Sequence, residues 1–333
     1  MLKKIRRSLL ALAIVVLALV SGYIYLFQRN YFNPAMDIGV SFDPSYARYL
    51  GLDVGKTFTT ILDTWKFHYI RLSAQWDEVE SKAGQFNFSE LDWLFAEAQK
   101  RNALITLALG QKTPRWPECH FPDWAKTLSP ADFKTARLAY ISAVVDHFKK
   151  QPSLEIWQVE NEPFLPFGDC PGFSTSDLTE ELNLVSQHDS THPRLVTDSG
   201  ELSTWRRTAN VAEYFGTTMY RVVWNKYLGY INYDWLPAAF YRIKLWILGR
   251  SPVTAFVVEL QAEPWIPDQQ PKEMSESEEA KSMDLARLKK NIAYAYRVGL
   301  PRVYLWGAEW WQEQAASGHP DIANYIQNLP KGH

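Results

Sequence analysis

From residue 36 onward, eight short apolar segments alternate with segments of helical periodicity. This alternation is typical of βα units, in which parallel strands are joined by helices. Helical spacing is clearest at 89–102, 131–150 and 278–299. Eight such units in about 300 residues fit a (β/α)8 barrel, or TIM barrel, which typically needs ~250 residues. The eight candidate strands are 36–41, 68–73, 103–109, 154–160, 194–198, 215–220, 254–259 and 302–307.

An open, doubly wound sheet is the alternative architecture. It usually carries a glycine-rich turn directly after the first strand. The corresponding stretch here, GVSFDPSY at 39–46, contains a single glycine. We therefore predict a TIM barrel that occupies residues 31–333.

The N-terminal segment has a different composition from the rest of the chain. Residues 8–27 carry no charge, and twenty helical residues at ~1.5 Å each span the hydrocarbon layer of a membrane. The basic residues that precede them are expected to stay in the cytoplasm, which sends the barrel outward. The sequence thus predicts that residues 1–30 are a cytoplasmic basic stub and a single-pass membrane anchor. The alternative is a signal peptide that is cleaved to release a secreted protein, but bulky Tyr23 to Phe27 end the apolar segment where small residues are usual.

The net charge bears on the kind of partner that the protein binds, and the two cysteines bear on a possible disulfide. Without residues 1–30, which hold five basic residues and no acids, 30 basic residues face 37 acidic ones, a net charge of −7. That balance argues against nucleic acid as a partner. Cys119 and Cys170 are the two cysteines, and in an exported domain they are candidates for a disulfide, with two unpaired thiols as the alternative.

Polar side chains gather where the predicted strands end, which in a TIM barrel is the catalytic rim. The second strand ends near Arg71, and the loop after the third strand contains Trp116. The fourth strand runs into Asn161-Glu162-Pro163, and the seventh ends in Glu259. Tyr220 ends the sixth strand, and the eighth ends in Trp306 with Glu309 shortly after it.

Two of these carboxylates suggest glycoside cleavage. A retaining mechanism needs one acid to protonate the leaving oxygen and a second to attack the anomeric carbon, with the carboxyl groups ~5 Å apart. Strands four and seven face each other across a barrel mouth, so Glu162 and Glu259 are candidates for these two roles. We expect Glu259 to stay ionised beside Arg71 and a tyrosine, and Glu162 to hold a proton in a drier setting.

Asn161-Glu162-Pro163 after the fourth strand, combined with Glu259 at the end of the seventh, resembles the retaining glycoside hydrolases of clan A. These are (β/α)8 barrels that include family 5 cellulases and mannanases and family 42 β-galactosidases. The resemblance implies that Glu162 is the acid/base, that Glu259 is the nucleophile, and that Asn161 contacts the sugar 2-hydroxyl. It also implies that Arg71 and Tyr220 position Glu259 and that Trp306 forms the floor of the −1 subsite.

Some positions depart from the family 5 pattern or leave alternatives open. Thr218 stands two residues before the tyrosine, where family 5 commonly has a histidine. Glu263 competes with Glu259 for the nucleophile, but it lies in a proline-containing loop, whereas Glu259 directly ends the strand. Glu160 is interpreted as a supporting acid. Trp116 and Glu309 are further candidates for contacts with the sugar.

The sequence therefore predicts a retaining β-glycoside hydrolase that cleaves an extracellular oligo- or polysaccharide by double displacement. The alternatives are a transglycosylase that uses the same glutamates and a non-catalytic glycan-binding barrel on the cell surface. The seven histidines show no metal-ligand spacing, and no phosphate-binding loop is recognised, so neither a metal nor a cofactor is expected.

Overall fold

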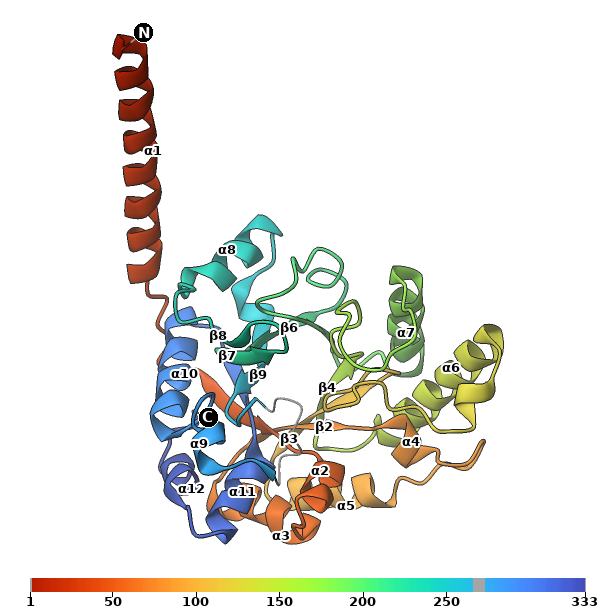
Figure 1. Ribbon diagram of the computed structural model, residues 1–333. Helices are drawn as coiled ribbons and strands as arrows, with labels where there is room; N and C mark the ends of the chain where they lie inside the picture. The colour runs from red at the N-terminus through yellow and green to blue at the C-terminus, as the bar shows by residue number, and fades with distance from the viewer. Residues whose placement is uncertain (1, 266–272, 333) are drawn as a thin grey trace.

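The computed structural model describes residues 2–265 and 273–332 and contains a closed barrel of eight parallel strands (Figure 1). The predicted TIM barrel is confirmed, and each predicted strand corresponds to a barrel strand. Around the barrel the strands follow the order β1-β10-β9-β6-β5-β4-β3-β2. The barrel strands are β1 (Asp37–Ser41), β2 (Tyr69–Ser73), β3 (Leu104–Leu109), β4 (Leu154–Val159), β5 (Arg194–Asp198), β6 (Tyr214–Met219), β9 (Ala255–Gln261) and β10 (Arg302–Trp306).

Helices surround the barrel, as a parallel sheet that is buried on both faces requires. Short elements supplement them: a π-helical turn (Thr60–Thr64) and 3-10 turns (Ala125–Thr127, Pro252–Thr254). The long helix α10 begins at an Asp284 cap and ends at Gly299, whose φ of 70° suits glycine. The helices are α1 (Leu2–Gln28), α2 (Pro44–Tyr49), α3 (Val54–Thr59), α4 (Trp76–Val79), α5 (Ser89–Lys100), α6 (Pro130–Phe148), α7 (Thr175–His188), α8 (Ala239–Ile247), α9 (Glu276–Glu279), α10 (Leu285–Val298), α11 (Ala308–Ala316) and α12 (Asp321–Gln327).

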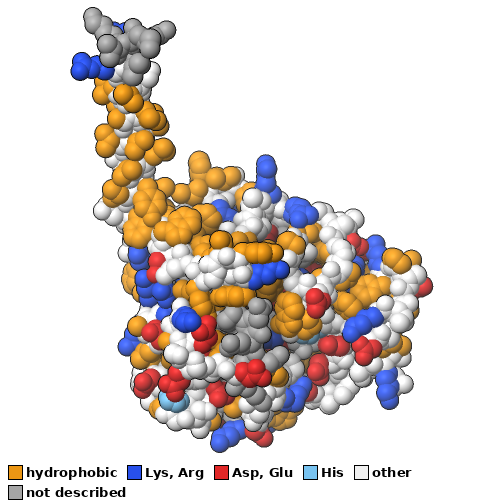
Figure 2. Space-filling model, in the orientation of Figure 1, with side chains coloured by type: hydrophobic (Ala, Val, Ile, Leu, Met, Phe, Trp, Pro, Cys, Tyr) orange, Lys and Arg blue, Asp and Glu red, His pale blue; other side chains and the backbone are white. Residues whose placement is uncertain are grey.

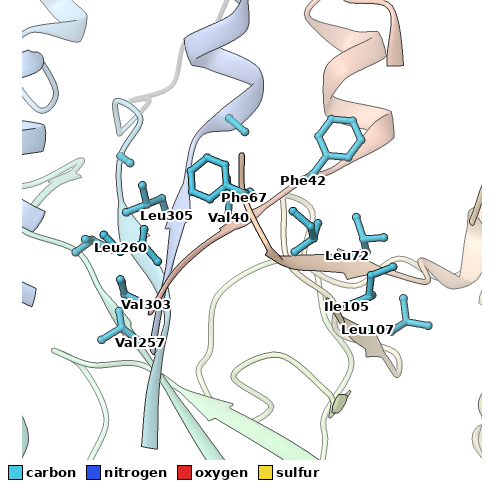
Figure 3. Packing of buried hydrophobic residues seen from close by; sticks show 14 of the residues in the cluster. Val40, Phe42, Phe67, Leu72, Ile105, Leu107, Val257, Leu260, Val303 and Leu305 are labelled. Atoms are coloured by element: carbon cyan, nitrogen blue, oxygen red, sulfur yellow. The ribbon is translucent and has the colours of Figure 1, made fainter. Parts of the chain in front are cut away.

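Two apolar clusters hold these layers together. The larger lies between the sheet and the helices and includes Val40, Leu72, Ile105 and Val303 (Figure 3). The smaller consists of Ile156, Leu195, Phe256 and Val258.

Strand register decides which side chains enter the barrel. Arg71 pairs with Thr106, and Thr106 pairs with Ile156, so these three side chains share one side of the sheet. Arg71 reaches Glu259 across the barrel, which identifies that side as the interior. The interior is thus apolar around Ile156 and polar around Arg71, toward the end of the barrel where the strands finish.

The connection from β6 to β9 is longer than a single crossover helix needs. It contains an antiparallel hairpin, β7 (Val222–Asn225) and β8 (Gly229–Asn232), followed by α8. The hairpin was not predicted, because each of its strands has only four residues and neither is fully buried.

Helix α1 projects away from the barrel, and α8 lies beside its base (Figure 1). Among the described residues, Arg6–Gln28 is the one helical segment that is long and apolar enough to cross a membrane, with a mean hydropathy of 2.6. Its side chains are almost all exposed. The Tyr23 hydroxyl at its C-terminal end donates to the Trp235 carbonyl at 2.5 Å.

Candidate active site

Glu259 on β9 is held by two donors at the mouth of the barrel. Arg71 Nη1 lies 2.8 Å from Glu259 Oε1, and the Tyr220 hydroxyl donates to Oε2 at 2.9 Å. Arg71 and Glu259 are both buried, so water screens this ion pair weakly. Burial, and then the neighbouring Glu259 carboxylate, raise the pKa of Tyr220 well above its usual value, which keeps the phenol protonated as a donor. These contacts fix the orientation of the Glu259 carboxylate.

Glu162 follows β4 in an unusual backbone conformation. Its φ is 45° and that of Glu160 is 62°, both in the left-handed region that residues other than glycine rarely adopt. The turn is fixed by a hydrogen bond from Glu162 N to Thr197 Oγ1 at 2.8 Å. Such local strain is common at functional sites.

The environment of the Glu162 carboxyl favours its protonated form. Burial is the main cause that raises its pKa well above the ordinary value, and the nearby carboxylates of Glu259 and Glu118 raise it further. The Thr218 hydroxyl, which donates to Glu162 Oε1 at 3.0 Å, and the Lys112 ammonium act in the opposite direction. Glu162 and Glu259 are therefore close enough to interact electrostatically but have different surroundings.

Asn161 binds residues that support both Glu259 and Glu162. Its Oδ1 accepts hydrogen bonds from Arg71 Nη2 at 2.9 Å, from Thr197 Oγ1 at 3.1 Å and from Gln158 Nε2 at 3.2 Å. The Oδ1 atom is thus fully used, and Asn161 Nδ2 is left as the donor. In the structure its acceptor is Glu118 Oε2, at 3.4 Å.

Glu118 is a third acid in the site, and the sequence reasoning missed it. Burial raises its pKa to about 7, with a further increase from Glu259, although Lys112 lowers it. Its position in the loop after the third strand, next to Cys119, is the signal that could have identified it. Cys119 forms a disulfide with Cys170, with Cα atoms 5.3 Å apart, which joins the loops after β3 and β4.

Arg115, from the same loop as Glu118, lies against Trp306. The central carbon of its guanidinium is 4.2 Å from the centroid of the Trp306 ring and 3.7 Å from that of the Tyr46 ring. It pairs with Glu263 at 2.5 Å and with Glu309 at 3.3 Å. Trp306, predicted as the floor of the −1 subsite, therefore has one face covered by the protein's own arginine.

The acids around Arg115 are buried as well. Burial raises the pKa of Glu309 to about 8, even though Arg115 lowers it. Glu309 Oε1 also accepts the Asp43 backbone N–H at 2.5 Å, so it supports the loop after β1. Burial likewise raises the pKa of Glu263, which is bound to Arg115 and is not held by Arg71 and Tyr220 as Glu259 is.

The space left beside Arg115 is small. A pocket lined by Asp43, Arg71, Arg115, Trp306 and other residues has a volume of about 10 Å³. That is room for about one water molecule.

An aromatic wall flanks the other side of the site. Trp265 packs edge-on against Tyr220, with ring centroids 5.4 Å apart, and Phe167 links Trp265 to Trp116. The Trp116 side chain is 61% exposed, so it stands on the rim rather than in the core.

Glu160 does not share the orientation of Glu162. It accepts backbone N–H groups of Gln111 and Lys112, at 2.7 and 2.9 Å. On its far side lies Glu181 of α7, which pairs with Arg137 at 2.7 Å. The two side chains do not share a side, because β4 ends at Val159 and the backbone turns at Glu160 and Glu162.

Comparisons with known proteins were made for sequence and for structure. The glycosyl hydrolase family 10 model matches residues 64–181, which are 118 of the 333 residues. The match includes Arg71, Asn161 and Glu162 and ends before Glu259. No curated protein sequence matches this chain.

Solved structures share the fold at low identity. Xylanase 10B from Thermotoga maritima has a TM-score of 0.55 at 16% identity, over 82% of this chain and 83% of that one. GH5_18 from Streptomyces cattleya, in complex with GlcNAc, has a TM-score of 0.60 at 12% identity, over 90% and 82%. The intracellular xylanase TsXylA from Thermoanaerobacterium saccharolyticum has a TM-score of 0.56 at 19% identity, over 84% and 87%. The family model supports the resemblance to the glycoside hydrolases of clan A, and the solved structures share the barrel fold of this chain.

Proposed function

We propose that this protein is a retaining β-glycoside hydrolase in which Glu259 is the nucleophile and Glu162 is the acid/base. The observation that carries the proposal is the contrast between the two acids. Glu259 is fixed by the Arg71 guanidinium and the Tyr220 hydroxyl, whereas Glu162 is buried beside two other carboxylates that favour its protonated form. A retaining glycosidase needs one carboxylate that is held in place as the nucleophile and one carboxylic acid that keeps its proton.

In the first step, a carboxylate oxygen of Glu259 attacks the anomeric carbon while Glu162 gives its proton to the glycosidic oxygen. The bond between that carbon and oxygen breaks, and the leaving sugar departs as an alcohol. The products on the enzyme are a glycosyl ester on Glu259 and an ionised Glu162. When the ester is hydrolysed in the second step, the Tyr220 hydroxyl and the Arg71 guanidinium stabilise the Glu259 carboxylate that is released.

In the second step, Glu162 accepts a proton from water as the water oxygen attacks the same carbon. The ester bond to Glu259 breaks, the sugar leaves with its original configuration, and Glu162 is protonated again. Asn161 Nδ2 is the group available to bind the sugar 2-hydroxyl in both steps. In the structure this nitrogen is bound to Glu118, so sugar binding must replace or share that contact.

We also propose that the substrate is a β-linked oligo- or polysaccharide outside the cytoplasm and that α1 anchors the enzyme in the membrane. The apolar Arg6–Gln28 segment supports the anchor. The Cys119–Cys170 disulfide supports an oxidising compartment. Activity on a panel of aryl β-glycosides and polysaccharides would identify the sugar.

Azide rescue tests the two assignments separately. In Glu259→Ala, azide can enter on the face of the lost nucleophile, and an activated β-glycoside should yield the α-glycosyl azide. In Glu162→Ala, the glycosyl–Glu259 ester still forms from a substrate with a good leaving group, and azide should yield the β-glycosyl azide. Identical product configurations in the two variants, or wild-type rates in either variant without azide, would refute the assignment. Proton NMR of the products gives the configuration directly.

A further inference from the structure

We propose that the barrel rests on the lipid surface through one side, the α8 face, rather than hanging free from its anchor. The α8 face is formed by α8, the segment 235–238 before it and the loop at 199–213. The occupant is the headgroup region of the bilayer that α1 is proposed to cross. The proposal therefore rests on the membrane anchoring proposed above and not on the chemistry of the active site.

Helix α8 is apolar on both of its sides. Ala239, Tyr241 and Leu245 are buried against the barrel. On the opposite side, Trp246 is 79% exposed and Ile247 is 66% exposed. Arg242 and Lys244 lie between these two sides and donate to backbone carbonyls. No described part of the chain covers Trp246 and Ile247.

The apolar surface continues on either side of α8. Trp235, before the helix, is 57% exposed, and Leu202 in the loop after β5 is 70% exposed. Leu202 is held near α8 because Lys244 Nζ donates to the carbonyls of Gly200 and Ser203. Large aromatic and aliphatic side chains in one contiguous region mark an interaction surface.

The position of α1 identifies the partner as a bilayer. Tyr23 donates to the Trp235 carbonyl, and the Arg297 guanidinium donates to the Phe27 carbonyl at 2.8 Å, so the end of α1 is fixed beside α8. The barrel side that bears α8 is the side from which α1 projects (Figure 1), and hydrophobic side chains surround the base of α1 (Figure 2). Where α1 leaves the membrane, Trp235 and Trp246 would lie at headgroup level, which tryptophan prefers.

The charges of this region suit anionic headgroups. Arg206 and Arg207 in the loop after β5 are exposed, as is Arg29 at the end of α1. The nearby acids already have partners among the described residues. Glu201 accepts the Tyr241 hydroxyl, Glu213 pairs with Arg194, and Asp234 pairs with Arg287 and Lys290. The unmatched charge on the α8 face is therefore positive, and basic residues near a membrane surface are attracted to anionic lipids.

A spin label at residue 246 tests the contact in the full-length protein. Trp246→Cys supplies a free thiol, because Cys119 and Cys170 are bonded to each other. The labelled chain is reconstituted in vesicles of phosphatidylcholine and phosphatidylglycerol, and collisions with oxygen and with a water-soluble nickel chelate are measured by electron paramagnetic resonance. Trp93→Cys is the matched control, since Trp93 is 38% exposed and lies on α5, on the opposite side of the barrel from α8.

At residue 246 we expect the label to collide more with oxygen than with the nickel chelate, as in a lipid environment. At residue 93 we expect the label to collide more with the nickel chelate, as in water. Equal nickel accessibility at both positions would overturn the proposal. So would a label at residue 246 that is shielded from both reagents, which indicates a protein partner or a second copy. Hydrolysis of a soluble aryl glycoside by the same vesicles reports on the proposed function independently, because residue 246 is outside the active site.

Discussion

The Thr218 hydroxyl lies 3.0 Å from Glu162 Oε1 and donates to it. Thr218 stands where family 5 commonly has a histidine, so this protein places a neutral, non-titrating donor beside its proposed acid/base. Among the neighbours of Glu162, Thr218 and Lys112 lower its pKa, while burial, Glu259 and Glu118 raise it. The balance of these contacts determines the pH at which the site works, and it leads to the first two predictions.

Thr218→Val should move the basic limb of the pH profile to higher pH. The hydroxyl stabilises the ionised form of Glu162, so its removal raises the pKa of the acid that must be protonated for catalysis. A hydrogen bond of about 1 kcal/mol corresponds to a shift of about 0.5–1 pH unit. The measurement is kcat/KM against pH. Thr217→Val, whose hydroxyl contacts the Thr218 carbonyl rather than Glu162, should leave that limb in place.

Glu118→Gln should move the same limb the other way. An ionised Glu118 raises the pKa of Glu162, so a neutral amide at this position lowers that pKa, by about one pH unit. Activity should then fall at a lower pH than in the wild type. Glu180→Gln, an exposed acid on α7 that pairs with Lys134, serves as the control. A shift of equal size in both variants would show that net charge, and not the contact, is responsible.

Tyr220→Phe should reduce kcat through the proposed nucleophile. The variant loses the hydrogen bond to Glu259 Oε2 but keeps the ring against Trp265. Hydrogen bonds to charged groups contribute about 1.5–3 kcal/mol, so a loss of about 10- to 100-fold in kcat is expected. Tyr214→Phe, at the start of the strand that Tyr220 follows and stacked on Phe256, should retain wild-type kcat. An unchanged kcat in Tyr220→Phe would argue against Glu259 as nucleophile.

Glu309→Gln should flatten the pH dependence of stability. The pKa of Glu309 rises from an ordinary 4.5 to about 8 on folding. Between these values the folded state binds more protons than the unfolded state, so stability is greatest below about pH 4.5 and falls as pH rises toward 8. The contribution is on the order of a few kcal/mol.

The amide cannot ionise, so the variant should lose this part of the decline in the free energy of unfolding between pH 5 and pH 8, as measured in urea. Glu90→Gln, at an exposed pair with Arg48, should keep the wild-type slope. The same slope in Glu309→Gln would mean that other groups are responsible.

Replacement of both cysteines by serine should destabilise the barrel by about 2–4 kcal/mol. Cys119 and Cys170 close a loop with a sequence separation of 51, and their bridge fixes the segment that carries Arg115 and Glu118. We therefore expect a rise in KM as well as a lower urea midpoint. The wild type treated with a reductant should behave like the double variant, and an unchanged midpoint in both would assign the bridge no role in stability.

The sequence by itself determined the barrel and the strand ends at which polar residues collect. Apolar runs and helical repeats can be recognised locally in the sequence. Only a few arrangements of a parallel sheet accommodate eight strand–helix units. Arg71, Asn161, Glu162 and Glu259 could be identified because each lies at the end of such a run, and strand ends share one rim.

Only the tertiary structure decided which side chains meet across that rim. Glu118 and Arg115 are in a loop whose sequence has no periodic pattern. The neighbouring residues in the sequence do not indicate that Glu118 binds Asn161 or that Arg115 covers Trp306. The opposite orientations of Glu160 and Glu162 also depend on two left-handed backbone angles that strand parity does not predict. The proton affinity of each acid is set by burial and by charges distant in the sequence, and both exist only once the chain has closed into a barrel.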